Sequence, residues 1–247
     1  MTATSVEQIT PLRRLEAPLV AAAENQRFLE LLRGLAADDW TKHTDCSGWD
    51  VRAMAAHVLG SMEAWVSVRE LVHVMRAARK AAGTGLFVDG LTAVQIRDRA
   101  NLTTKQLLER MECAAIRSAR RRGRLPTPFR RATIEGNVGP MPETWRLGYL
   151  ADVILTRDTW MHRVDICRAT GREMVLTAEH DGRIVADIVA EWVRRHGKPC
   201  TLALEGPAGG VYTSGTGEQI TIDAVEFCRV LSGRGTGTGL LAQQVPF

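Results

Sequence analysis

The sequence TWRLGYLADVILTRDTWMHRVDICRAT, residues 144–170, carries a helical pattern around which the rest of the chain can be arranged. Its apolar residues recur at intervals of three and four, which predicts a helix packed into a bundle. Continued at the same period, the apolar stripe reaches Asp158, His162 and Asp165, where a buried helix normally carries Leu or Val. Burying a carboxylate and an imidazole is costly unless they are paired or bind a metal. The pattern therefore predicts a polar cluster inside the bundle.

Three further amphipathic segments are expected to complete a four-helix bundle. Helical periodicity predicts a helix over 12–37, a second from about 50 to 81, and a third helical region over 92–122. Asp50 is the expected N-cap of the second helix, and Thr103 to Gln106 has the spacing of a capping box. The Pro- and Gly-rich stretch over 123–143 is expected to be a long crossover loop. Four long amphipathic helices predict an all-α bundle.

The pattern changes near Gly171. A helix expected over 178–196 is followed by strand-like runs at 200–204, 210–212 and 219–222, and by a short helix over 224–231. This last part is too short for a doubly wound fold. The chain is therefore expected to be α+β overall, with an all-α four-helix bundle over 1–172 and a small α+β domain over 173–247.

Composition restricts the environment and the partners. The five cysteines are scattered and form no CxxC pair, which favours a reducing compartment and argues against both a disulfide framework and a cysteine-based zinc site. No segment is apolar enough for a signal peptide or a membrane span, so we expect a cytoplasmic protein with no membrane partner. The arginine-rich segment 117–131 would suit nucleic acid or an anionic ligand. Because few aromatic residues accompany it, a solvated helix end and loop is the preferred interpretation.

A metal site is one interpretation of the polar cluster. Asp158 and His162 are four residues apart and share one side of their helix, and His57 lies among small residues on the second helix. Two imidazoles and a carboxylate are a common catalytic zinc set, and helical bundles build metal sites from facing helices. Spacing alone favours the alternative, in which His162 pairs with Asp158 or Asp165 and His57 is an ordinary, partly exposed histidine.

Two motifs resemble those of a known family. The run CSGWDVR at 46–52, followed by AHV at 56–58, and the run DTWMHRVDI at 158–166 resemble the mycothiol-dependent maleylpyruvate isomerase family. These proteins are DinB-like metal-binding bundles. The runs LEGPAGG at 204–210 and CRVLSGR at 228–234 are similar to their sterol-carrier-like C-terminal domain. The resemblance covers nearly the whole chain.

The resemblance implies one divalent metal, typically zinc, held by His57, Asp158 and His162. This chain departs from the family pattern at 158, where it has Asp in place of the usual Glu. Because Asp is one methylene shorter, the helices approach more closely, the metal affinity is lower, or the metal differs. Asp165, one turn beyond His162, is either a hydrogen-bond partner for a ligand or a helix-end partner of an arginine.

The implied activity is that of a thiol-dependent enzyme. The open position on the metal would hold a low-molecular-weight thiol, mycothiol in this family, as a thiolate. Attack of the thiolate on a small electrophile gives an S-transferase, or an isomerase if addition and elimination are reversible. Arg234 is a candidate for binding the anionic substrate or the thiol, with a solvated turn arginine as the alternative. The rival functions are a non-catalytic metal-binding or regulatory protein and a metal-dependent hydrolase. The sequence leaves the oligomeric state open between a monomer and a homodimer.

Overall fold

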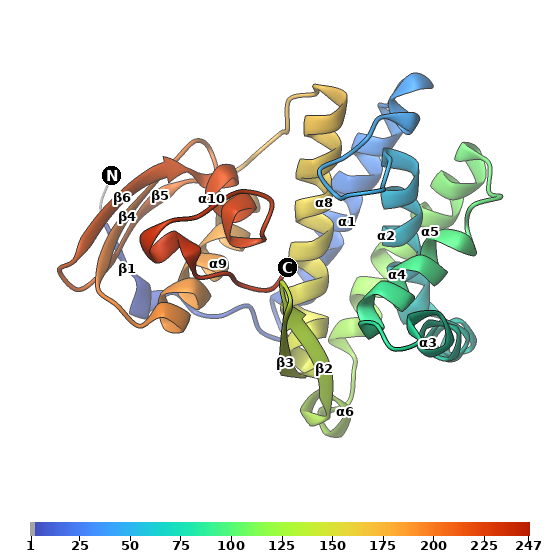
Figure 1. The fold of residues 1–247 in the computed structure, drawn as a ribbon, viewed down its shortest axis with the longest axis horizontal. Coiled ribbons are helices and arrows are strands. Elements are labelled where there is room, and N and C mark those ends of the chain that lie inside the picture. Colours follow the sequence, from blue (N-terminus) through green and yellow to red (C-terminus); the bar gives the residue numbers. More distant parts are fainter. Residues whose placement is uncertain (1–2) are drawn as a thin grey trace. The chain divides into compact units, whose positions relative to one another are not determined.

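The computed structural model describes residues 3–247 and divides them into two compact units (Figure 1). The helical unit comprises Arg14–Ala132 and Arg146–Glu173, and the other comprises the chain up to Arg13, Thr133–Trp145 and Met174–Phe247. The α+β class is confirmed. The units differ from the expected division at 172/173, because two earlier segments group with the C-terminal part.

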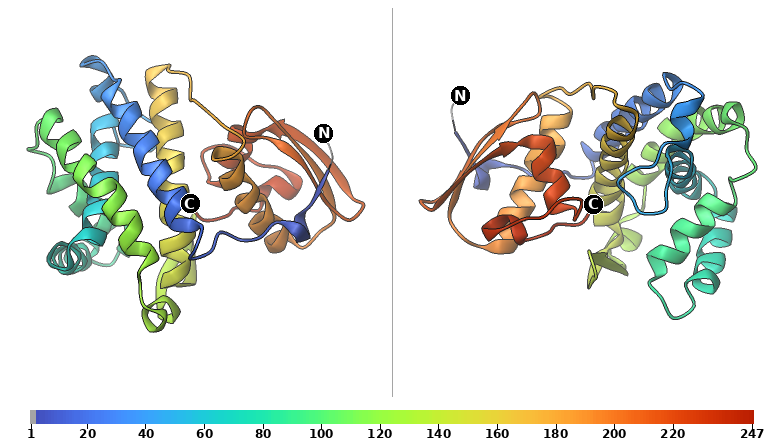
Figure 2. Two further views of the ribbon diagram at one scale, coloured as in Figure 1. Left: turned by 180° about the vertical axis from the view of Figure 1, so that it is seen from behind. Right: turned by 45° about the horizontal axis from the view of Figure 1, so that its top comes forward.

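Four helices form the bundle: α1 (Ala17–Arg33), α2 (Val51–Val66), α5 (Thr104–Gly123) and α8 (Leu155–Thr170). Helix α1 packs against α5 and α8, and α2 packs against the same two helices (Figures 1 and 2). Between them lies an apolar core that includes Phe28, Leu29, Met54, Leu59, Leu107, Met111 and Ile166. The 3-10 turn η2 (Asp38–Thr41) lies between α1 and α2 in the chain. The expected bundle is confirmed, with α1 beginning only at Ala17.

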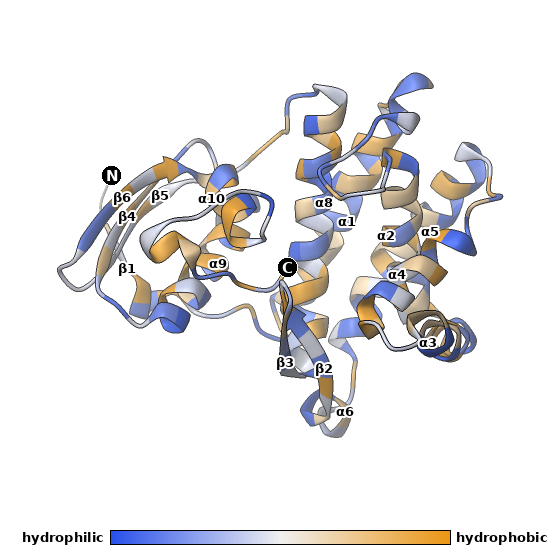
Figure 3. Ribbon diagram, viewed as in Figure 1, coloured by the Kyte–Doolittle hydropathy of each residue, from blue (hydrophilic) through white to orange (hydrophobic). Residues whose placement is uncertain are grey.

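Helix α8 is buried along most of its length although many of its residues are hydrophilic (Figure 3). It follows the short helix α7 (Leu147–Tyr149) and a π-helical turn, η3 (Leu150–Ile154). A π turn inserts an extra residue into the helix and is frequent at functional sites. The apolar stripe and the polar cluster of this segment are therefore separated by a change in helical register.

The prediction of a single helix over 50–81 is wrong. It consists of α2 and α3 (Val68–Ala82), separated at Ser67, whose extended backbone ends α2 and whose side chain caps α3. Helix α4 (Phe87–Arg97) packs against α3, and this helical hairpin follows α2 and precedes α5 in the chain. Since α3 lies outside the four-helix core, its Val72 is 41% exposed. The capping box of α5 at Thr103 is confirmed.

The prediction of a long crossover loop over 123–143 is also wrong in part. Residues 127–131 form the short helix α6 (Thr127–Arg131), and a two-stranded hairpin follows, β2 (Thr133–Val138) and β3 (Met141–Arg146). Gly139 makes the turn with a positive φ of 52°, which residues with a side chain rarely adopt. The hairpin belongs to the C-terminal unit, where Glu143 pairs with Arg195.

The C-terminal unit is a four-stranded sheet in the order β1-β5-β4-β6, packed against two helices. Its elements are β1 (Thr4–Ser5), η1 (Val6–Gln8), α9 (Asp181–His196), β4 (Cys200–Glu205), β5 (Gly210–Ser214), β6 (Glu218–Asp223), α10 (Ala224–Leu231) and η4 (Gly239–Ala242). Strand β4 is antiparallel to β5 and parallel to β6. The N-terminal segment joins this unit because β1 pairs with β5 and the Leu12 amide donates to Asp187. Among the described helices, none is long and apolar enough to cross a membrane.

Candidate metal centre

Three side chains from two bundle helices converge at one point. His57 on α2 and His162 on α8 direct their Nε2 atoms toward the carboxylate of Asp158, also on α8. His57 Nε2 lies 3.4 Å from Asp158 Oδ2, and His162 Nε2 lies 3.2 Å from Asp158 Oδ1. The two imidazole rings meet edge to face, with centroids 5.2 Å apart. The structure thus brings together the three residues that the motifs indicated.

The separations fit a tetrahedral metal site. Two ligand atoms on a tetrahedral zinc ion, with bonds of about 2.0–2.1 Å, lie about 3.3 Å apart. Each histidine–carboxylate distance is close to that value, the two running to different oxygens of Asp158, and one ligand atom from each residue lies within 4.8 Å of the others. The shorter Asp158 side chain therefore reaches both imidazoles. The donor set suits zinc, and three protein ligands leave one tetrahedral position for a further ligand.

The second nitrogen of each histidine is held by a protein acceptor. Nδ1 of His57 lies 2.8 Å from Gln95 Oε1, and Nδ1 of His162 lies 3.2 Å from Asp165 Oδ2. An acceptor at Nδ1 selects the tautomer that carries the proton there and leaves the lone pair on Nε2. Metal-binding histidines almost always have such partners. Both imidazole rings are thus held in fixed orientations, with Nε2 toward the Asp158 carboxylate.

Gln95 reaches His57 because α2 has a glycine opposite it. A Cβ atom on Gly60 would lie 2.7 Å from Cβ of Gln95 and 3.0 Å from Nη1 of Arg99. The small residues around His57 thus make room for another helix, α4. Arg99 secures that helix, since it is buried and pairs with Glu63 on α2. Sequence reasoning missed Gln95. The third helical region was expected to begin at residue 92, in the middle of α4, so the helix that carries Gln95 was not recognised.

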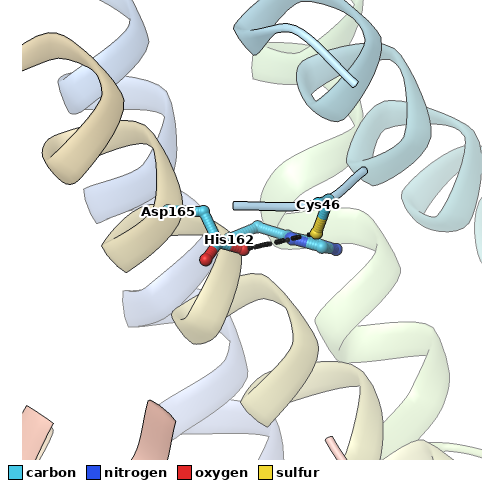
Figure 4. Close-up of side chains that lie close together, drawn as sticks. All are labelled: Cys46, His162 and Asp165. Atoms are coloured by element: carbon cyan, nitrogen blue, oxygen red, sulfur yellow. Dashed lines mark hydrogen bonds and ion pairs between the residues drawn. The ribbon is translucent and has the colours of Figure 1, made fainter. Parts of the chain in front are cut away.

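Asp165 is fully buried beside His162, and Cys46 lies next to Asp165 (Figure 4). The thiol of Cys46 lies 3.7 Å from Asp165 Oδ2. Cys46, His162 and Asp165 form a second group close enough to share a metal. That group would use Nδ1 of His162, whereas the His57 group uses Nε2. Each group has two buried members and one partly exposed member, which is Asp158 in the His57 group and Cys46 in the other.

The arginines near Asp165 have other partners. Arg163 forms a buried two-pronged pair with Glu24, and Arg168 pairs with Asp45 at the surface. Of the two interpretations of Asp165, the contact with His162 is therefore the one that the geometry supports. Trp49 packs against both site histidines, with ring centroids 5.1 Å from His57 and 5.9 Å from His162.

Strong electrostatic coupling joins Asp158 and His162. Burial by itself raises the pKa of Asp158, but the charges and hydrogen bonds of His162 and His57 outweigh it and hold that pKa well below its usual value. Burial lowers the pKa of His162, but the Asp158 carboxylate dominates and raises it well above its usual value. Without metal the two form an ion pair. A metal must therefore displace a proton from His162.

Comparisons with known proteins give the family. The family profile described as "Mycothiol maleylpyruvate isomerase N-terminal domain" matches residues 21–167, which include all three converging residues. The chain belongs to this family. A crystal structure of a mycothiol-dependent maleylpyruvate isomerase is similar, with 17% identity, a TM-score of 0.58, and coverage of 94% of this chain and 93% of that one. A mutant of that isomerase gives a TM-score of 0.57 at the same identity and coverage. These structural likenesses establish the fold, and a comparison with curated proteins gives no match.

Arg234 lies in the C-terminal unit, in the segment after α10, whereas the converging residues belong to the helical unit. Its main-chain amide bonds to the carbonyl of Arg229, and its carbonyl accepts from the Arg229 guanidinium. These contacts fix the backbone of the turn. A role for Arg234 in binding the substrate or thiol stays a prediction.

Proposed function

We propose that this protein is a cytoplasmic, zinc- and mycothiol-dependent enzyme that isomerises a small electrophilic substrate. His57, Asp158 and His162 would hold the metal. The observation that carries the proposal is the convergence of two Nε2 atoms and one carboxylate at the separations of tetrahedral ligands, with each Nδ1 held by a buried partner. Family membership supports the thiol.

A zinc ion at this site supplies positive charge that holds a thiol as its thiolate at neutral pH. The protein residues perform the remaining tasks. Gln95 and Asp165 would accept the Nδ1 protons and fix the ring orientations, so that each Nε2 is presented to the metal. The partly exposed carboxylate of Asp158 marks the side from which thiol and substrate enter.

Isomerisation needs no group beyond the thiol. The thiolate adds to an alkene carbon conjugated with a carbonyl group, and the π electron pair moves onto that carbonyl as an enolate, so that the former double bond is a single bond that can rotate. Elimination of the same thiolate then restores the double bond in the trans geometry and regenerates the thiol. If elimination does not follow, the product is a thioether and the enzyme is an S-transferase.

The test is thiol-dependent turnover of maleylpyruvate by zinc-loaded protein. We expect conversion to the trans isomer only with mycothiol, and its loss in His162→Ala. His73→Ala is the matched control, because His73 is half exposed and pairs with Asp98 outside the cluster. Thioether formation would assign the transferase reaction, and hydrolysis without thiol would assign the hydrolase. Unchanged turnover by a metal-free His162→Ala protein would overturn the mechanism.

A further inference from the structure

Arg122, the penultimate residue of α5, is a buried cation in the helical unit. It is 4% exposed and lies within electrostatic reach of the carboxylates of Asp152 and Asp158. Burial lowers its pKa to about 10, opposed by both carboxylates, so it is charged at neutral pH. Helix α5 also packs against the π turn η3, which carries Asp152. A buried positive charge at the end of α5 is thus electrostatically coupled to Asp158 of the candidate metal centre.

One edge of this guanidinium has no partner. Among residues 3–247, no atom hydrogen-bonds to Nε or Nη2 of Arg122, and both nitrogens are buried. These two N–H groups point the same way and form the edge that binds a carboxylate with two parallel hydrogen bonds. Elsewhere in the same unit the edge is used in that way. Arg163 donates from Nε and Nη2 to the two oxygens of Glu24, at 2.8 and 3.0 Å.

The nearby carboxylates do not complete the site. Asp152 is already paired with Nη2 of Arg130. Asp158 is in contact with both histidines and would be neutralised by a bound divalent cation. With metal present, the charge on Arg122 would therefore be poorly compensated. A buried charge in that state is costly, and an anion is the ligand that would offset the cost.

We propose that Arg122 is the anion-binding residue of this site, and that it receives a carboxylate of the electrophilic substrate through its Nε and Nη2 edge. This inference rests on the proposed function, because it places the substrate beside a metal-held thiol. It deepens that function by assigning the residue that binds the substrate's carboxylate. Arg122 would hold one end of the molecule so that its electrophilic carbon faces the thiol.

The experiment is calorimetric titration of zinc-loaded protein with succinate, an unreactive dicarboxylate, and with its neutral diamide. We expect succinate to bind and the diamide not to bind. Arg122→Met should weaken succinate binding by about tenfold or more, the effect of losing a buried charge-assisted pair. Arg121→Met is the matched control, because Arg121 is the exposed neighbour on the same helix. It should bind succinate as the wild type does.

A second readout separates binding from a structural role. Because the Nε and Nη2 edge is unpartnered without ligand, Arg122→Met should melt at or above the wild-type temperature in the absence of anions. If Arg122→Met does not fold, or melts well below the wild type while binding succinate normally, Arg122 is structural and the proposal is overturned. Arg122→Lys keeps the charge but loses the two-pronged edge, so it should also bind succinate more weakly. Wild-type affinity in Arg122→Lys would contradict the proposal.

Zinc analysis of the same samples distinguishes this inference from the proposed function. Wild-type protein that holds zinc but binds succinate no better than the Arg122→Met variant would refute the role of Arg122 alone. Protein that holds no zinc, yet binds succinate through Arg122, would refute the metal-dependent function alone. To identify the carboxylate's source, 3-mercaptopropionate is compared with 2-mercaptoethanol on the wild type and the Arg122→Met variant. The affinity that Arg122 adds for 3-mercaptopropionate over 2-mercaptoethanol is compared with the affinity that it adds for succinate. A larger gain in affinity for the carboxylate-bearing thiol would assign the carboxylate to the thiol and contradict the proposal.

Discussion

Gln95→Met tests whether the buried partner of His57 contributes to metal binding. Met keeps the length and linear shape of Gln but removes the acceptor, which lies 2.8 Å from His57 Nδ1. A buried donor left without a partner costs about 1–3 kcal/mol. Loss of such a partner typically weakens metal affinity about 10–100-fold, which is about 1.4–2.7 kcal/mol. The two estimates agree, so we expect zinc affinity to fall by about that factor.

The assay is competition with a chromophoric chelator at fixed pH. Gln95→Glu restores an acceptor at the same position and should recover most of the affinity. Gln26→Met, the same substitution on α1 at a partly exposed position, is the control for the loss of an amide. An unchanged zinc dissociation constant in Gln95→Met, with normal folding, would refute the idea that this hydrogen bond orients His57.

Two further results are expected. Gly60→Ala should lower the free energy of unfolding by about 1–3 kcal/mol in urea melts, because the new Cβ would lie 2.7 Å from Gln95; equal stability would contradict the close packing. Against the effect of burial, the pKa of Asp158 is lowered and that of His162 is raised. The Asp158 contribution is lost as pH falls through the lowered pKa, and the His162 contribution is lost as pH rises from about 6.5 toward the raised pKa. Metal-free protein should therefore lose stability as pH rises above about 6.5, and a larger loss in the His162→Ala variant would contradict the ion pair.

Much of the helical unit follows from local signals. The Asp50 N-cap and the Thr103 capping box each act within one helix, and the structure has both. The helix predicted over 144–170 begins only at Leu147, after β3, and is interrupted by the π turn η3 before α8. The division of the second helix at Ser67 was missed because its residues keep a helical period on both sides of the break. Capping of α3 by the Ser67 side chain is a local signal that could have located the division.

Features that depend on distant contacts could not be predicted. The first strand has only two residues, and its place is set by pairing with β5. The hairpin over 133–146 carries Gly and Pro, which indicate turns and loops more strongly than strands. For the site, the motifs supplied His57, Asp158 and His162, but Gln95 and Arg122 belong to no motif. In the folded unit, Gln95 is revealed by its bond to His57, and Arg122 by a buried guanidinium edge that has no partner among residues 3–247.

The most direct test of the central claim is elemental analysis of protein purified without chelator, with wild type and His162→Ala prepared side by side. The account predicts about one zinc ion per wild-type chain and its loss in the variant, since His162 supplies one of three ligands. Absence of metal from both proteins would contradict it. The substitution of Asp for the family's Glu at position 158 would then have abolished the metal site, and the binding-protein function would replace the enzyme.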